Sequence, residues 1–298
     1  MPTPYEISFK IADIVFRLSS PDQTVRLKLE ETTCRFSCHN ARPDVEVAAR
    51  WQDLSNGAVK GRMLFDPGES YKLYEQDGAY LFAFYAPAAD SIPYKAARMR
   101  RSFTSGEVLL HPLFFEREEA HFPLDYPLDE LLFVNVLSRG KGVELHACGM
   151  TDANGNGHLF VGQSGAGKST IAQLLTDLPG ITILSDDRIA VRTKGGNPWM
   201  FGTPWHGDAQ LASPDSAPLR TVLFLSKHPA NELVPLPRAA VVQRLFACSF
   251  LPFFDPTTLE FALSFLDGMA CNVACYELRF RPDREVAGLV EKLIYERP

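Results

Sequence analysis

The sequence has 298 residues and a formal net charge of −6, and 46% of its residues are hydrophobic while 22% are charged. This is the composition of an ordinary folded protein, which excludes disordered and fibrous classes, and the length suits one large or two ordinary domains. No basic region dominates the chain, so nucleic acid is not an expected partner.

The first residues lack the features of a secretory signal. They mix acidic with apolar side chains and show neither a basic lead nor a small-residue cleavage site. No run approaches the roughly 20 apolar residues that span a bilayer. We therefore expect a cytoplasmic protein without a membrane partner. Its six cysteines are expected to be free thiols, because the chain is long and shows no secretory signal. The pairs Cys34/Cys38 and Cys271/Cys275 lack the spacing of a zinc site.

Residues 5–85 have the alternation of β-strands. Ile7, Phe9 and Ile11 alternate with polar residues, and the pattern shifts near Asp13 before it resumes, which fits a bulged strand or two short strands. The turn signals Asp-Pro-Gly at 66–68 and Asp-Gly at 77–78 separate further apolar runs. The first third is therefore predicted to be a mostly antiparallel β lobe.

A basic segment and an irregular stretch follow the β pattern. Residues 95–101, KAARMRR, carry four basic residues in seven. Such a run either contacts an acidic substrate or a nucleotide phosphate, or forms the solvated face of a helix. Residues 111–126 are rich in Pro and Phe without clear periodicity, which suits a connection. We predict a domain boundary near residue 120, with domains at 1–120 and 121–298.

The second domain is predicted to open with a helix and a strand. Pro127 stands at the first position of an apolar-periodic segment that Gly140 terminates. The strand GVELHACG then carries His146, and a tight turn leads into the next strand. A histidine on a strand is commonly a packed core residue, so His146 alone does not indicate catalysis.

Residues 158–175, HLFVGQSGAGKSTIAQLL, match the Walker A or P-loop pattern G-x-x-x-x-G-K-[ST] in its strand-loop-helix context. Inward N–H groups of such a loop and the positive end of the following helix hold a polyphosphate. The lysine neutralises the outer phosphates and the serine hydroxyl is a ligand for Mg²⁺. The sequence thus predicts an ATP and Mg²⁺ site formed by Gly162, Ser164, Gly165, Ala166, Gly167, Lys168, Ser169 and Thr170.

Adjacent aspartates, Asp186 and Asp187, separate two β-like runs at 181–184 and 189–191. The gap is too short for the crossover that parallel neighbours need, so these runs form a hairpin or one bent strand, in a mixed or antiparallel sheet. One aspartate can complete a Mg²⁺ shell while the other takes a proton from an attacking hydroxyl. The alternative is a solvated turn, where aspartate is common.

The rest of the chain contains a long loop and further regular elements. Residues 199–219 are punctuated by Pro and Gly, and Trp205, His206 and Asp208 in this loop are candidates to shape a pocket. A strand is predicted at 219–226, helices at 239–248 and 255–273, a strand at 275–280, and a last helix capped by Asp283.

Three segments together resemble the C-terminal catalytic domain of HPr kinase/phosphorylase: GQSGAGKS, the histidine of LHACG, and ILSDD. The likeness extends over about residues 125–295. It implies an α/β (α+β) P-loop domain with a mixed sheet, related to ATP-dependent phosphoenolpyruvate carboxykinase, behind the β lobe. It also implies a kinase that transfers phosphate from Mg-ATP to a protein serine, with Asp186 as base, Asp187 and Ser169 at the metal, and His146 assisting.

The chain departs from that family at one motif. The arginine- and glycine-rich signature after the aspartates is absent, and FGTPWHGD takes its place. The expected acceptor is therefore a serine of a peptide or protein, or a small hydroxylated molecule, rather than HPr. An alternative function is ATP binding without catalysis, in a regulatory or assembly protein whose β lobe binds a partner. Assembly into a homo-oligomer is an analogy with the family.

Overall fold

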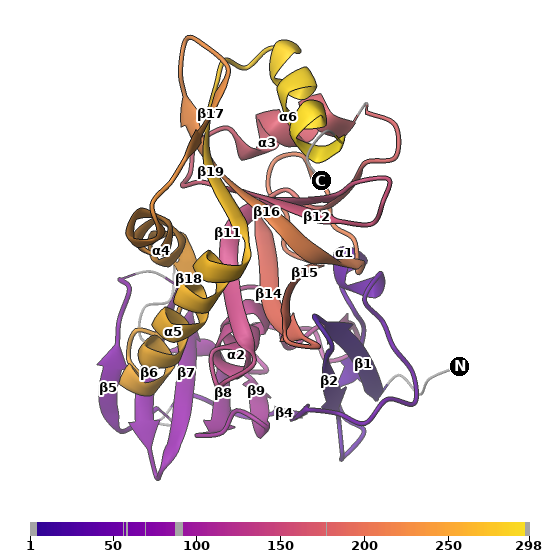
Figure 1. The fold of residues 1–298 in the computed structure, drawn as a ribbon. Coiled ribbons are helices and arrows are strands. Elements are labelled where there is room, and N and C mark those ends of the chain that lie inside the picture. The colour runs from indigo at the N-terminus through magenta and orange to yellow at the C-terminus, as the bar shows by residue number, and fades with distance from the viewer. Residues whose placement is uncertain are drawn as a thin grey trace. The chain divides into compact units, whose positions relative to one another are not determined.

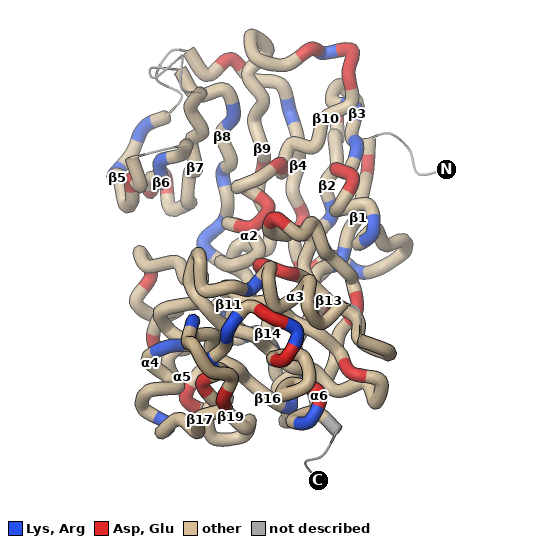
Figure 2. The backbone as a smooth tube through the Cα atoms, turned by 90° about the horizontal axis from the view of Figure 1, so that it is seen from above, with Lys and Arg blue, Asp and Glu red and all other residues tan. Residues whose placement is uncertain are grey.

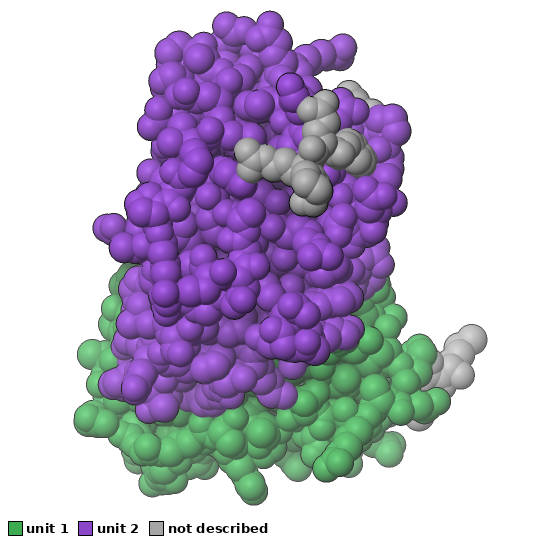
Figure 3. Space-filling model, viewed as in Figure 1, with its two compact units in different colours: residues 1–136 green, residues 137–298 purple. Residues whose placement is uncertain are grey.

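The computed structural model describes residues 5–295 apart from 56, 58, 69, 87–91 and 177. Two compact units make up the chain, residues 1–136 and residues 137–298, which Figure 3 shows in two colours. No helix of the described part of the chain is both long and apolar enough to cross a membrane.

The boundary between the units lies at 136/137, later than the expected position near 120. The reason is that residues 120–136 pack within the first unit. Strand β10 (Ala120–His121) pairs with β3 (Arg26–Leu27), and the ring of Phe133 lies 6.5 Å from that of Phe16.

An eight-stranded sheet with the order β1-β2-β4-β9-β8-β7-β6-β5 forms the first unit. Five neighbouring pairs are antiparallel, and the pairs β2–β4 and β4–β9 are parallel. The sheet is thus mostly antiparallel, as predicted, but it includes two parallel pairs. Its elements are β1 (Glu6–Ile11), β2 (Ile14–Ser19), α1 (Glu31–Cys34), β4 (Val45–Trp51), β5 (Arg62–Phe65), β6 (Tyr71–Gln76), β7 (Ala79–Tyr85), β8 (Pro93–Arg100) and β9 (Ser105–Leu110).

Two features of this unit answer questions that the sequence left open. Strands β1 and β2 are separate, because Ala12 and Asp13 take left-handed backbone angles, with φ of 48° and 58°, in the turn between them. The basic run is strand β8 rather than a helix. Lys95 is buried and forms an ion pair with Asp125, and other cations of the run pair with acidic residues of the same unit.

A nine-stranded mixed sheet forms the second unit, and its two long strands, β11 and β16, each have several partners. Strand β16 runs parallel to β12 and β19 and antiparallel to β15. The strands are β11 (Gly142–Thr151), β12 (Gly157–Val161), β13 (Thr182–Ser185), β14 (Arg188–Lys194), β15 (Asn197–Gly202), β16 (Ser216–Lys227), β17 (Glu232–Pro235), β18 (Ser249–Phe250) and β19 (Ala274–Phe280).

Strands β13 and β14 pair one after the other with the same strand, β11. Of the two alternatives that the sequence allows, a hairpin or one bent strand, the structure has the bent strand. The bend holds Asp186 and Asp187, and the carbonyl of Asp187 accepts a hydrogen bond of 3.0 Å from the Ala147 amide of β11. This pairing sets the aspartates beside the strand that carries His146.

Helices cover both faces of this sheet (Figure 1). Leu159 and Val161 of β12 pack in a core with α4 and α5, whereas Phe160 between them packs with α3 and α6. Because neighbouring side chains of a strand point to opposite faces, the two helix pairs lie on opposite sides. These helices are α3 (Lys168–Thr176), α4 (Arg238–Ala247), α5 (Pro256–Asn272) and α6 (Glu285–Tyr295). Helix α2 (Leu128–Leu137) lies almost entirely in the first unit and begins one residue after Pro127, where the sequence predicts its start.

Candidate functional site

The glycine-rich loop at residues 162–167 connects the end of β12 to the start of α3. Gly165 and Gly167 have φ angles of 79° and 106°, a region that residues with a Cβ rarely adopt. A Cβ on Gly167 would lie 2.7 Å from the Phe280 ring. The amide of Ile171 donates to the Gly167 carbonyl at 2.9 Å and begins the helix. The loop conformation therefore depends on its glycines.

Lys168 is the first residue of α3, and its side chain turns back along the loop. Its Nζ donates to the carbonyls of Gly162 at 3.0 Å and Gln163 at 3.5 Å, and lies 3.8 Å from Oδ1 of Asp187. Only 7% of the residue is exposed. Burial lowers the pKa of Lys168, and the charge of Asp187 opposes this effect. The ammonium is thus held between the loop and a carboxylate.

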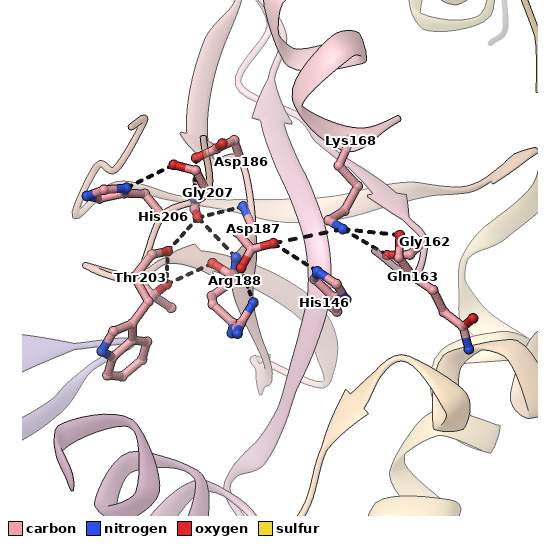
Figure 4. Close-up of polar contacts among 12 residues, drawn as sticks. His146, Gly162, Gln163, Lys168, Asp186, Asp187, Arg188, Thr203, His206 and Gly207 are labelled. Carbon is pink, nitrogen blue, oxygen red and sulfur yellow. Dashed lines mark hydrogen bonds and ion pairs between the residues drawn. The ribbon is translucent and has the colours of Figure 1, made fainter. Parts of the chain in front are cut away.

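Asp187 lies at the centre of a polar cluster (Figure 4). Its Oδ1 is 2.8 Å from Nε2 of His146, and its Oδ2 pairs with the guanidinium of Arg188. Burial alone would raise the pKa of Asp187, but the hydrogen bond from His146 and the charges of Arg188 and Lys168 hold this pKa below its usual value. Asp187 is therefore a carboxylate at neutral pH.

Asp186, next in the chain, has an entirely different environment. It is fully buried, and its Oδ1 accepts hydrogen bonds from the amides of Gly207 at 2.9 Å and Leu211 at 3.3 Å, while its Oδ2 accepts from Ala209 at 2.9 Å. The Asp186 carboxylate is therefore hydrogen-bonded to three backbone amides and has no exposed surface that a substrate could contact. The resemblance implies a base role for Asp186, whereas its hydrogen bonds in this structure are those of an anchor for the 207–211 loop.

The cluster and the glycine-rich loop share a cavity of about 580 Å³, which we call the Lys168 cavity. It brings eight of the eleven predicted site residues together, and Asp186, Gly162 and Ala166 do not line it. Its lining consists of His146, Ser164, Gly165, Gly167, Lys168, Ser169, Thr170, Asp187, Arg188, Gly207, Asp208 and Lys227.

The Lys168 cavity is lined by three basic side chains and two carboxylates. The sequence predicts only one of the basic side chains. Lys168 was expected there, whereas Arg188 and Lys227 were not. Arg188 directly follows the aspartate pair, and Lys227 directly follows the predicted strand at 219–226. These positions in the sequence could have identified both residues as site candidates. Figure 2 shows acidic and basic stretches next to one another beside β14. Basic side chains around a polar cavity favour a polyanion.

The oxygen donors of the Lys168 cavity are suited to Mg²⁺. The Ser169 hydroxyl and the carboxylates of Asp187 and Asp208 line the same space, and hard oxygen ligands are those that Mg²⁺ prefers. Among the described residues, no group of three or more His, Cys, Asp or Glu forms a metal cluster. Mg²⁺ commonly takes one or two protein ligands and completes its shell with phosphates and water.

A second cavity, of about 500 Å³, adjoins the same loop, and we call it the Arg244 cavity. It includes the predicted residues Gly162 and Ala166, and it shares Ser164, Gly165 and Lys227 with the Lys168 cavity. The lining consists of Val161, Gly162, Gln163, Ser164, Gly165, Ala166, Phe224, Leu225, Ser226, Lys227, Arg244, Ala247, Cys248 and Glu277.

Comparisons with known proteins give little further information about this site. No family model matches the chain, and no curated protein matches its sequence. Solved structures similar to it include the HPr(Ser) kinase/phosphatase from Coxiella burnetii, at 13% identity and a TM-score of 0.31, over 51% of this chain and 88% of that chain. A likeness at this level assigns neither a family nor an activity, so the functional argument rests on the residues of the site.

Proposed function

We propose that this protein is a kinase that transfers the γ-phosphoryl group of Mg-ATP to a hydroxyl group. The observation that carries the proposal is the convergence of Lys168, His146 and Asp187 in a cavity that the glycine-rich loop also lines. Phosphoryl transfer requires a phosphate cradle, a cation and a proton acceptor in one place, since positioning and electrostatic stabilisation do most of the catalysis.

Phosphates would be held mainly by the loop and by the start of α3. The N–H groups of the loop and the positive end of the helix favour an anion there. Lys168 neutralises the outer phosphates, and Arg188 and Lys227 stabilise the charge that develops during transfer. When bound, Mg²⁺ would be held by Ser169 and Asp208 and would neutralise phosphate oxygens.

Asp187 is the proposed proton acceptor, in place of Asp186. The acceptor oxygen bonds to the γ-phosphorus, its proton passes to the Asp187 carboxylate, and ADP leaves with the electrons of the broken P–O bond. His146 fixes the orientation of this carboxylate through its hydrogen bond of 2.8 Å. The proposed acceptor is a serine of a peptide or protein, or a small hydroxylated metabolite.

A transfer assay with γ-labelled ATP and Mg²⁺ tests the proposal, with free serine, serine-containing peptides and a cell extract as acceptors. Wild-type protein is expected to label an acceptor. Asp187→Asn should lower the rate by roughly 10²–10⁴-fold while ATP still binds. Asp267→Asn is the matched control, because Asp267 is a partly exposed carboxylate that pairs with Arg238 outside the cavity.

Three results would contradict parts of this proposal. Tight ATP binding without transfer to any acceptor would favour the alternative, a regulatory or assembly protein that binds ATP and uses its β lobe for a partner. Recovery of Asp187→Asn activity at high Mg²⁺ concentration would return Asp187 to the metal-ligand role that the sequence assigns to it. Unchanged ATP affinity in Lys168→Ala, measured by calorimetry, would contradict the proposal that this loop binds the nucleotide.

A further inference from the structure

We propose that the Arg244 cavity binds the nucleoside part of the nucleotide, and that the face of the Arg244 guanidinium stacks on the base. The inference rests on the proposed function, because it extends the site from the phosphates to the nucleoside. It also identifies the phosphoryl donor as a nucleoside triphosphate rather than an inorganic polyphosphate.

The two cavities adjoin each other along the glycine-rich loop. Ser164 and Gly165 of the loop, and Lys227 at the end of β16, line both of them. A chain of phosphates held on the loop N–H groups in the Lys168 cavity would therefore extend past Lys227 into the Arg244 cavity. The nucleoside of a nucleotide whose phosphates lie in the Lys168 cavity can therefore reach the Arg244 cavity.

The chemistry of the Arg244 cavity differs from that of the Lys168 cavity. Val161, Phe224, Leu225, Ala247 and Cys248 give it an apolar wall, whereas the Lys168 cavity is lined by glycines and by polar and charged side chains. Small-molecule sites of roughly 300–1,000 Å³ are mostly apolar with a few placed polar groups, and a cavity of about 500 Å³ lies in that range. The aromatic base of a nucleotide fits this wall better than a phosphate or an acceptor hydroxyl.

Arg244 lies at the side of this cavity, with 41% of its side chain exposed, and Glu277 orients its guanidinium. Its two terminal nitrogens each donate to Oε1 of Glu277 at 3.1 Å, and Oε2 of Glu277 accepts from Nε of Arg279 at 2.9 Å. The guanidinium carbon lies 5.8 Å from the centre of the Phe224 ring. Planar guanidinium groups stack on aromatic faces, and a group that is already oriented loses less entropy when it does so.

Calorimetric titration with Mg-ATP and with Mg-tripolyphosphate tests the inference on the full chain. Arg244→Ala should weaken ATP binding roughly tenfold, the effect of losing one stacked base, and leave tripolyphosphate binding unchanged. Arg244→Lys should restore only part of the ATP affinity, because it keeps the charge and lacks the plane. The control is Arg238→Ala on the same helix, where the arginine pairs with Asp267 and both affinities should stay at the wild-type level.

Tripolyphosphate binding by the same sample also shows that the loop is folded. An equal loss for ATP and tripolyphosphate in Arg244→Ala would overturn the inference, because Arg244 would then act through its charge alone. Unchanged ATP affinity with a raised KM for the acceptor would also overturn it and assign the cavity to the acceptor. Wild-type protein that binds neither ligand would refute the proposed function, which is a separate result.

Discussion

Two regions meet at the bend between β13 and β14, and each uses an aspartate for a different purpose. In the Lys168 cavity, Asp187 faces His146, Lys168 and Arg188, and 22% of its side chain is exposed. On the other side, Asp186 has no exposure and accepts hydrogen bonds from backbone amides of the 207–211 loop. Access to solvent and the kind of partner, rather than residue type, decide which carboxylate is available to a substrate.

The largest expected effect separates the two aspartates in activity. Asp187→Asn should reduce kcat by roughly 10²–10⁴-fold, because the proton acceptor is lost. Asp186→Asn should keep most of kcat but destabilise the protein by about 1–3 kcal/mol, since one of the two acceptor oxygens becomes an NH₂ group that cannot accept from the loop amides. Steady-state kinetics and urea unfolding on both variants measure the difference. Loss of kcat in Asp186→Asn at unchanged stability would return the base role to Asp186.

The sequence predicts well those parts of the site that are local in the chain. A strand, a glycine-rich loop and a helix at residues 158–175 follow from spacing alone. The gap at the aspartates, too short for a crossover, limits the two runs to a hairpin or one bent strand. The different roles of Asp186 and Asp187 do not follow. They depend on amides 21 to 25 residues further on, and no pattern in the sequence specifies where that loop folds back.

The basic run in the first unit shows the same limit. Its composition suits a helix face, but Lys95 pairs in register with Leu110 of β9 and Phe84 of β7. Pairing with two neighbouring strands outweighs local propensity, because strand formation depends on the context of the sheet. The predicted domain boundary near residue 120 precedes the division after Val136 for a related reason, since residues 120–136 contact β3 and Phe16, which are distant in the chain.

An intermediate effect is expected in the pH dependence of ATP binding. Burial lowers the pKa of Lys168 and the negative charge of Asp187 raises it, so removal of that charge lets the pKa fall further. ATP binding is lost as pH rises through this pKa, and the alkaline limb should therefore move to lower pH in Asp187→Asn. Titration of ATP affinity between neutral and alkaline pH measures the shift. Asp186→Asn is the control, and an equal shift in both variants would contradict the separation of the two regions.

The smallest expected effect concerns Asp152, a carboxylate that, like Asp186, accepts backbone amides. Asp152 accepts from the amides of Asn154 and Asn156, and its Oδ2 lies 3.3 Å from Nε2 of His158, which is 3% exposed. Burial lowers the pKa of His158 below its ordinary value of 6.5, although Asp152 opposes this. His158 is therefore neutral in the folded protein at pH values where its side chain is already protonated in the unfolded chain.

Stability should consequently fall as pH decreases below 6.5 and the unfolded state binds the extra proton. The loss at pH 5.5 is at most about 1.4 kcal/mol for one such group. The lowered pKa of Asp152 contributes nothing in this window, because that stability is lost only in stronger acid. Urea unfolding at pH 7.5 and 5.5 should show the loss in wild type and a smaller one in His158→Gln, with His228→Gln as the control. Equal losses in all three proteins would mean that other groups set the acid sensitivity of this unit.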